Sequence, residues 1–391
     1  MCKYLNRDFK GGTSDSNDLL CEVFAQELAE KKRIHSFSLL APVRKILPSH
    51  TKSIKAEQIR SSSFKILVQT FNRKLSAQFF IMPDTSKLLE FTNKFIVEDG
   101  TTISLKDHDT DYDHKQLPKA EGEALLQLGI QKLSELQDKL YIHNQYSMLI
   151  VIQAMDAAGK DSVVKHVMSG LNPQGVKVHS FKVPTPQELA HDFLWRHCLV
   201  LPAKGEICIF NRSHYENVLV TKVHPEYILK ENLQDIEKVE DIDQAFWEKR
   251  YKQINRFEKT WADNGMIILK FFLHVSKKEQ KKRFIERIDD PAKNWKFSYA
   301  DLKERARWKE YRKAYEEMLN NTSRSHAPWF IIPADDKWFT RLAVAGIIYQ
   351  YMEKLNLSYP KLNEGQKAIL AKAKEELMNE NMKESNGVTE N

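Results

Sequence analysis

Cysteine is scarce in this chain of 391 residues, and the four that occur, Cys2, Cys21, Cys198 and Cys208, show no C-x-x-C spacing. Their scatter argues against a zinc site and against a disulfide framework, and it fits a reducing cytoplasm. Long apolar runs are missing too, since no stretch approaches the ~18 residues that a membrane helix needs. The N-terminus lacks the apolar core of a signal peptide. We therefore expect a cytoplasmic protein that does not enter a membrane.

Excess charge is confined to the start of the chain, although the whole sequence carries a net charge of +7. Residues 1–80 hold 14 Lys and Arg against 7 Asp and Glu, whereas residues 81–391 hold 46 of each kind. The basic segment is rich in Ser and Thr ("IRSSSFK") and has no clear periodicity. We predict that it is a flexible N-terminal extension. Binding of nucleic acid or another polyanion by this arm is an alternative with little support.

The remaining sequence alternates between apolar runs and helical patterns. The runs that predict strands lie at 148–152, 177–183, 206–210, 266–275 and 329–333. The continuous run "MLIVI" at 148–152 suits a strand that is buried on both faces of a parallel sheet. Helices are predicted at 119–144, from Asp161 onward, at 186–197, at 242–263 and after Ser276, which has capping-box spacing with Glu279.

This order of elements predicts an α/β fold with a doubly wound parallel sheet of about five strands, flanked by helices. We place the folded domain at 81–364 and a charged helical tail at 365–391. The aromatic and apolar residues of the 242–263 helix (Phe246, Trp247, Ile254, Phe257 and Trp261) predict core packing, with an oligomer interface as the alternative.

The stretch "QAMDAAGKDS" follows the first predicted strand and resembles a phosphate-binding loop with two substitutions. Ala154 stands where that loop has its first Gly, and Asp161 where it has the hydroxyl that binds Mg²⁺. Gly159 permits close backbone approach, and Lys160 can reach phosphate oxygens at the start of a helix. Asp156 and Asp161 are the carboxylates that could hold the metal. A chance Gly-Lys pair at a helix start is the alternative.

Two further segments carry cations that suit phosphate chemistry. Arg212, in "IFNRSHYENVLV", follows a predicted strand at the edge where α/β sheets bind ligands, and its guanidinium can donate two hydrogen bonds to a phosphate. In "ERIDDPAKNWKFSYADLKER", Pro291 and the Asn294-Trp295 pair interrupt a basic helix and leave a loop with Lys293 and Lys296. A basic loop over a phosphate site is typical of a lid that excludes water.

Together these motifs resemble the polyphosphate kinase 2 family, as do "GLNPQGVKVHSFKVPTPQELAHDFLWR", "LPAKGEICIFNRSHYENVLVTKVHPE", "FLHVSKKEQKKRF" and "APWFIIPADDKW". The resemblance covers roughly residues 85–360. It implies a P-loop kinase fold with a helical lid. It also implies phosphoryl transfer between polyphosphate and a nucleotide that depends on Mg²⁺, with Mn²⁺ as an alternative to Mg²⁺. The motif "QAMDAAGKD" and Asn211 are most similar to the subgroup that accepts both AMP and ADP. GMP and GDP are further candidate acceptors.

The resemblance also implies residue roles. Asp156 would hold Mg²⁺, and Asp161 would lie beside the nucleotide phosphates. Lys160 and Arg212 would contact the phosphates, and Asn211 would orient the acceptor or a metal-bound water. The implied nucleotide and phosphate contacts are Ala157, Ala158, Gly159, Asp161, Ser162, Asp192, Arg196, Tyr215 and Glu216. The implied lid and polyphosphate contacts are Arg287, Lys293, Lys296 and Arg305. The family commonly forms dimers or tetramers, whereas a nucleic-acid partner is not expected.

Some positions depart from the family or play no part in its chemistry. Ser162 replaces a Gly that is usual in this subgroup, and His214 replaces a commoner Tyr or Trp. We interpret His166, His214 and His274 as core or surface residues, because phosphoryl transfer requires no catalytic histidine. Two other functions stay open at this point. They are ATP-dependent phosphorylation of a small molecule on the same fold, and polyanion binding without catalysis.

Overall fold

The computed structural model describes residues 91–113 and 117–386. By its internal contacts the chain divides into Met1–Ile81 and Met82–Asn391, and the described residues belong to the second unit. The prediction of a flexible extension at 1–80 therefore lies outside the described residues.

A six-stranded sheet forms the centre of this unit, in the order β1-β6-β5-β2-β4-β3. The strands are β1 (Ile96–Val97), β2 (Ser147–Ala154), β3 (Val176–Ser180), β4 (Ile207–Asn211), β5 (Met266–His274) and β6 (Trp329–Pro333). The five predicted strands are confirmed, and they pair in parallel. The sixth strand, β1, is antiparallel to β6 and has two residues, too few to give a periodic signal in the sequence.

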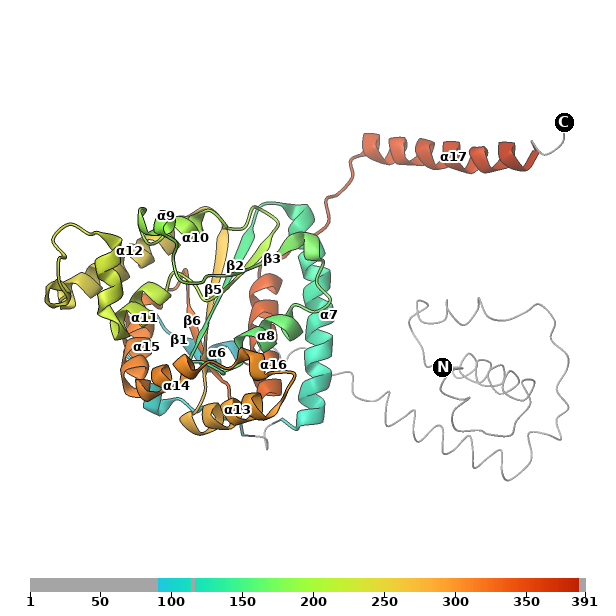
Figure 1. The fold of residues 1–391 in the computed structure, drawn as a ribbon. Coiled ribbons are helices and arrows are strands. Elements are labelled where there is room, and N and C mark those ends of the chain that lie inside the picture. Colours follow the sequence, from blue (N-terminus) through green and yellow to red (C-terminus); the bar gives the residue numbers. More distant parts are fainter. Residues whose placement is uncertain (1–90, 114–116, 387–391) are drawn as a thin grey trace, which may run out of the picture. The chain divides into compact units, whose positions relative to one another are not determined.

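Helices cover both faces of the sheet, so the unit consists of three layers with the sheet in the middle (Figure 1). On one face α7 (Lys119–His143), α8 (Lys160–Val167) and α16 (Lys337–Glu353) contribute to a core that includes Ile150 of β2. On the other face α11 (Glu216–Val223), α12 (Gln244–Asp263) and α15 (Trp308–Thr322) contribute to a core that includes Val151. All eight residues of β2 are buried, which confirms the prediction made from its apolar run.

The predicted helix at 186–197 is wrong in one respect, because two short helices, α9 (Pro186–Leu189) and α10 (Trp195–Cys198), stand in its place. The interruption has a local cause. Asp192 accepts a hydrogen bond from the backbone N–H of Leu194 at 2.9 Å, and such side-chain bonds compete with a continuous helix. In α12 the predicted core packing is confirmed, since Trp247, Ile254 and Trp261 are buried.

The predicted lid segment consists of α13 (Lys277–Asp289), η7 (Asn294–Lys296) and α14 (Tyr299–Ala306), so the break at Pro291 is confirmed. Half of the predicted capping box forms at α13. The Ser276 hydroxyl accepts from the N–H of Glu279 at 3.0 Å. The N–H of Ser276 donates instead to Asp335, and the Glu279 carboxylate binds Arg283.

The remaining elements are α6 (Phe91–Phe95), η3 (Leu105–Asp107), η4 (Pro173–Gly175), η5 (Pro225–Glu231), η6 (Val239–Asp241) and α17 (Glu364–Asn386). In the part of the chain that the structure describes, no helix has both the length and the apolar character needed to cross a bilayer.

Candidate active site

The predicted phosphate loop connects the end of β2 at Ala154 to the start of α8 at Lys160. Two of its residues have left-handed backbone conformations, Ala157 at φ 59° and Gly159 at φ 109°. The glycine adopts this conformation readily, whereas an alanine there costs about 1–2 kcal/mol. This strand–turn–helix geometry directs helix N-terminal N–H groups toward an anion. The loop therefore has the backbone arrangement that phosphate binding requires.

Two side chains of α13 hold this loop in its conformation. The guanidinium of Arg283 donates to the carbonyls of Ala157 (3.1 Å) and Ala158 (2.7 Å). It also donates to the carbonyls of Ala334 (2.7 Å) and Asp335 (2.9 Å), which follow β6. Gln280 donates to the carbonyl of Asp156 at 2.9 Å. The helix that leads into the lid thus fixes the shape of the phosphate loop.

Neither Arg283 nor Gln280 was predicted as a site residue. The sequence contains one signal, the i,i+4 spacing of Glu279 and Arg283, and this spacing is also typical of surface helices. Only the fold shows that the arginine points at the loop, with its side chain 4% exposed.

The two charged residues that open α8 are bonded within the site. The Lys160 ammonium donates to the carbonyl of Ala154 at 2.9 Å. Burial lowers the pKa of Lys160, the neighbouring Asp156 opposes that shift, and Arg212 adds to it. Asp161 accepts from the Asn211 amide at 2.8 Å. This bond ties the phosphate loop to the end of the adjacent strand β4.

Arg212 follows β4 and has an unusual backbone conformation for an arginine, at φ 63°. Its side chain is exposed, and in the described part of the chain it makes no hydrogen bond or ion pair. Glu216 begins α11 one turn later. Burial raises the pKa of Glu216, while the charges of Arg212 and Lys160 oppose that shift. Ile152 of β2 pairs with Asn211 of β4, so these charged groups converge at the carboxyl ends of two neighbouring strands.

A cavity of about 340 Å³ opens beside Arg212 and Glu216. Its lining includes the predicted residues Asp192 and Arg196 together with an apolar wall, formed by Phe181, Val183, Pro184, Leu189, Phe193 and Val220. Arg196 donates to the carbonyl of Lys182 at 2.9 Å and lies 3.5 Å from the carboxylate of Glu188. The cavity thus combines apolar surface for a flat ring with cations for a phosphate.

The four predicted lid cations lie on α13, η7 and α14 or on the turn that joins them, and they differ in their contacts. Lys293 pairs with Asp290 at 2.6 Å, and the Lys296 ammonium lies 5.0 Å from the Trp295 ring centre. Arg287 packs over Phe284, with 5.7 Å between the guanidinium and the ring centre. Arg305 donates to the side chain of Gln280.

The lid also brings a carboxylate toward the phosphate loop. Burial raises the pKa of Asp301 in α14, and the charge of Asp156 raises it further. The charges of Arg287 and Arg212 oppose the shift. The Asp301 carboxyl of α14 is therefore within electrostatic reach of Asp156 and Arg212.

The side chains of two predicted contact residues are bonded away from both the phosphate loop and the cavity. Tyr215 is fully buried, and its hydroxyl donates to Glu258 at 2.7 Å. It cannot touch a ligand from there, because the residue lies on the inner side of the turn that exposes Arg212. Ser162 has its hydroxyl bonded to Arg341 of α16 at 2.8 Å. That bond turns the serine toward the helix layer, so it does not crowd the phosphate loop.

The donor set suits a magnesium ion that takes most of its ligands from substrate. Asp156 offers a carboxylate that accepts no hydrogen bond from the described residues, and Asp161 offers a second oxygen beside Asn211. No cluster of three or more His, Cys, Asp or Glu with metal-binding geometry occurs in residues 91–113 and 117–386. Mg²⁺ commonly binds one or two carboxylates and completes its octahedron with phosphate oxygens and water. The residues present fit that mode.

This chain is similar in sequence and in fold to known proteins. The family model described as "Polyphosphate kinase 2" matches residues 116–360. An "ADP-polyphosphate phosphotransferase" of Rhodopseudomonas palustris is 45% identical over 287 residues, which cover 73% of this chain and 98% of that one. An "AMP/ADP-polyphosphate phosphotransferase" of Meiothermus ruber is 44% identical over 269 residues, covering 68% and 95%. The crystal structure of a polyphosphate kinase 2 from Arthrobacter aurescens superposes with a TM-score of 0.62 at 37% identity, covering 71% and 99%.

Proposed function

The chain belongs to the polyphosphate kinase 2 family, and from that premise we propose that it transfers a phosphoryl group from inorganic polyphosphate to AMP, ADP or both. The protein is a transferase, and its reaction is polyphosphate-dependent nucleotide phosphorylation. GMP and GDP are further candidate acceptors. The relatives from R. palustris and M. ruber carry names that include ADP and AMP/ADP, respectively.

One observation supports the proposal most. Lys160, Arg212 and Glu216 converge where β2 and β4 end, beside a cavity with one apolar wall. We propose that the base and ribose of the acceptor occupy this cavity near Asp192 and Arg196. The acceptor phosphate would then lie against Arg212. An exposed arginine without a partner in the described residues can donate two hydrogen bonds to that phosphate.

The donor phosphates would lie between the phosphate loop and the lid. N–H groups at the start of α8 and the Lys160 ammonium would bind the donor end of polyphosphate. The rest of the polyphosphate would be bound by the four lid cations, Arg287, Lys293, Lys296 and Arg305. Phosphoryl transfer needs alignment of the two oxygens and neutralisation of the charge on the transferred group. Arg212 would neutralise that charge as it develops.

Magnesium would be held by Asp156 and Asp161, and it would neutralise phosphate oxygens when bound. Manganese has similar ligand preferences and would be accepted at the same carboxylates. Without a metal, Asp156 would repel the donor phosphates. Chelation of the divalent ion should therefore abolish turnover, and addition of either ion should restore it.

The proposal is tested with purified protein, Mg²⁺, polyphosphate and each of AMP, ADP, GMP and GDP, with products separated by chromatography. We expect ADP or ATP to form only when polyphosphate is present. Phosphorylation of a small molecule by ATP without polyphosphate would favour the small-molecule kinase instead. Loss of polyphosphate binding on deletion of residues 1–80, with no turnover by the full chain, would favour a polyanion-binding protein.

We also propose a homo-oligomer, a dimer or a tetramer, and a cytoplasmic location. The resemblance to the family supports the oligomer, and the scattered cysteines support the location. Light scattering coupled to gel filtration would measure the molar mass against 45.7 kDa for one chain.

A further inference from the structure

The turn between β4 and α11 has an unusual division between exposed and buried residues. Arg212 is exposed, and Glu216 begins α11, whereas Ser213, His214 and Tyr215 between them are fully buried. Arg212 also has the left-handed backbone conformation, at φ 63°. Such a conformation persists in an arginine only where the surrounding structure determines it strongly. The conformation of Arg212 is therefore fixed through the three buried residues that follow it.

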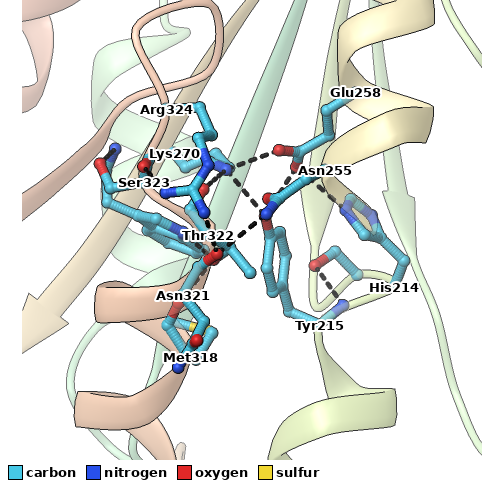
Figure 2. A network of polar contacts seen from close by, with 12 residues as sticks. His214, Tyr215, Asn255, Glu258, Lys270, Met318, Asn321, Thr322, Ser323 and Arg324 are labelled. Carbon is cyan, nitrogen blue, oxygen red and sulfur yellow. Dashed lines mark hydrogen bonds and ion pairs between the residues drawn. The ribbon is translucent and has the colours of Figure 1, made fainter. Parts of the chain in front are cut away.

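Figure 2 shows that Tyr215 joins a buried polar network beneath this turn. Its hydroxyl donates to Glu258 of α12 at 2.7 Å and accepts from Lys270 of β5 at 2.7 Å. Lys270 also donates to Glu258 at 2.6 Å and to the carbonyl of Thr322 at 2.7 Å. A nitrogen of His214 lies 3.2 Å from the same carboxylate. The network thus holds two consecutive residues of the turn from two other elements.

The charges at the centre of this network are withdrawn from water, since Lys270 and Glu258 are both 0% exposed. Burial lowers the pKa of Lys270 to about 8, although Glu258 opposes the shift. Burial would raise the pKa of Glu258, but Lys270 and His214 lower it. The three donors of the ammonium have three acceptors, Tyr215, Glu258 and Thr322. The ammonium is therefore fully bonded, which favours one arrangement of Tyr215, Glu258 and Thr322 around it, whereas the Nδ1 atom of His214 is buried without a partner among the described residues.

Stability alone is a weak reason for such a pair. Desolvation of two charges offsets most of their attraction, and apolar residues of similar volume often stabilise a protein as well or better. What the network does provide is a fixed position for Tyr215, three residues from Arg212 along the turn. A second contact fixes the turn at Ser213, whose hydroxyl accepts from Gln153 of β2 at 3.1 Å.

We propose that Tyr215, Glu258 and Lys270 are positioning residues that hold Arg212 in place for phosphoryl transfer. This inference rests on the proposed function, in which Arg212 neutralises the transferred phosphate. Tyr215 contacts no substrate and acts through the backbone of the turn. The network therefore contributes to the rate of transfer more than to substrate binding.

The test is a double-mutant cycle between Tyr215→Phe and Arg212→Ala, with kcat and KM measured for ADP and polyphosphate. Tyr215→Phe keeps the ring and removes only the hydroxyl. We expect it to lower kcat about tenfold, because small displacements of a catalytic group cost large factors in rate. Both KM values should stay within about twofold. In the Arg212→Ala background the same change should lower kcat by less than about twofold, because the group that it positions is gone.

Tyr251→Phe is the matched control, since Tyr251 is another buried tyrosine, lies on α12 and has its hydroxyl 3.4 Å from Lys222. It should leave kcat unchanged. A second variant, Glu258→Leu with Lys270→Met, removes both charges. We expect it to fold with a Tm near that of wild type and to lose kcat about as much as Tyr215→Phe does.

The outcomes separate the inference from the proposed function. No polyphosphate-dependent turnover by wild type would overturn both. Wild-type turnover with an equal loss from Tyr215→Phe in both backgrounds would overturn the inference alone. So would unchanged kcat in Tyr215→Phe, or full activity in the Glu258→Leu/Lys270→Met variant.

Discussion

Replacement of Arg283 by methionine should damage both the stability of the fold and the phosphate loop. The guanidinium donates four hydrogen bonds to backbone carbonyls and one, at 3.0 Å, to Glu279, so each of its five donors is used. Methionine fills similar volume without a donor. The carbonyls of Ala157 and Ala158 would then lose their partner in the left-handed part of the loop.

The magnitude follows from the type of bond and its burial. One hydrogen bond to a charged group contributes about 1.5–3 kcal/mol, and bonds from one group do not add independently. Removal of one partner from a buried ionic cluster costs about 3–5 kcal/mol. We expect a loss of about 3–5 kcal/mol in the free energy of unfolding, or roughly 10 °C in Tm. Turnover should fall about 10²-fold, because the loop would shift relative to the substrate.

Thermal unfolding followed by tryptophan fluorescence, and initial rates with polyphosphate and ADP, measure the two effects. Arg283→Lys should fall between wild type and Arg283→Met, because an ammonium restores the charge without the planar fork. Lys282→Met is the control, since Lys282 lies on the same helix and is 65% exposed. If Arg283→Met has a Tm within about 2 °C of wild type and turnover within about twofold, the reasoning is refuted.

Three further predictions concern single side chains. Lys160→Ala should leave a folded protein whose turnover is lower by at least ~10²-fold, the scale of losing one transition-state donor; near-normal initial rates would exclude the role given to Lys160. Arg212→Lys should lower kcat by about tenfold, since a point charge cannot replace a two-pronged donor; equal kcat values would show that this geometry is unimportant. Burial lowers the pKa of His274 to about 4, below the ~6.5 of an unfolded histidine. The unfolded chain therefore binds a proton first, and stability present above pH ~6.5 should decrease, by at most about 3 kcal/mol, as the pH falls toward 4. His274→Gln should show a smaller decrease in Tm over that range, and equal slopes would contradict this account.

Much of the scaffold could be predicted because its signals are local. All eight residues of the strand β2 are buried, and an uninterrupted apolar run at 148–152 forms most of it. The break of the lid helix at Pro291 follows from the missing N–H of proline. The helix predicted across 186–197 was wrong because one side chain, Asp192, caps a new turn within it. That competition depends on a rotamer, which a propensity pattern does not contain.

The site was predicted less completely, because position in sequence does not determine which way a side chain points. Tyr215 lies within a motif of phosphate-site residues, yet its hydroxyl bonds inward to Glu258. Arg283 lies in a run of lysines that is typical of a solvated helix surface, yet its side chain faces the phosphate loop. In both cases the deciding partners are more than 40 residues away in the chain, so only the fold brings them together.

The backbone conformation of Arg212 has a consequence for protein engineering. Glycine would relieve a left-handed conformation that costs an arginine about 1–2 kcal/mol. A selection for heat tolerance alone should therefore favour Arg212→Gly, and the more durable enzyme obtained in this way would be a poor catalyst. Stabilisation programmes for this scaffold should hold position 212 fixed and seek their gains away from the turn that carries it.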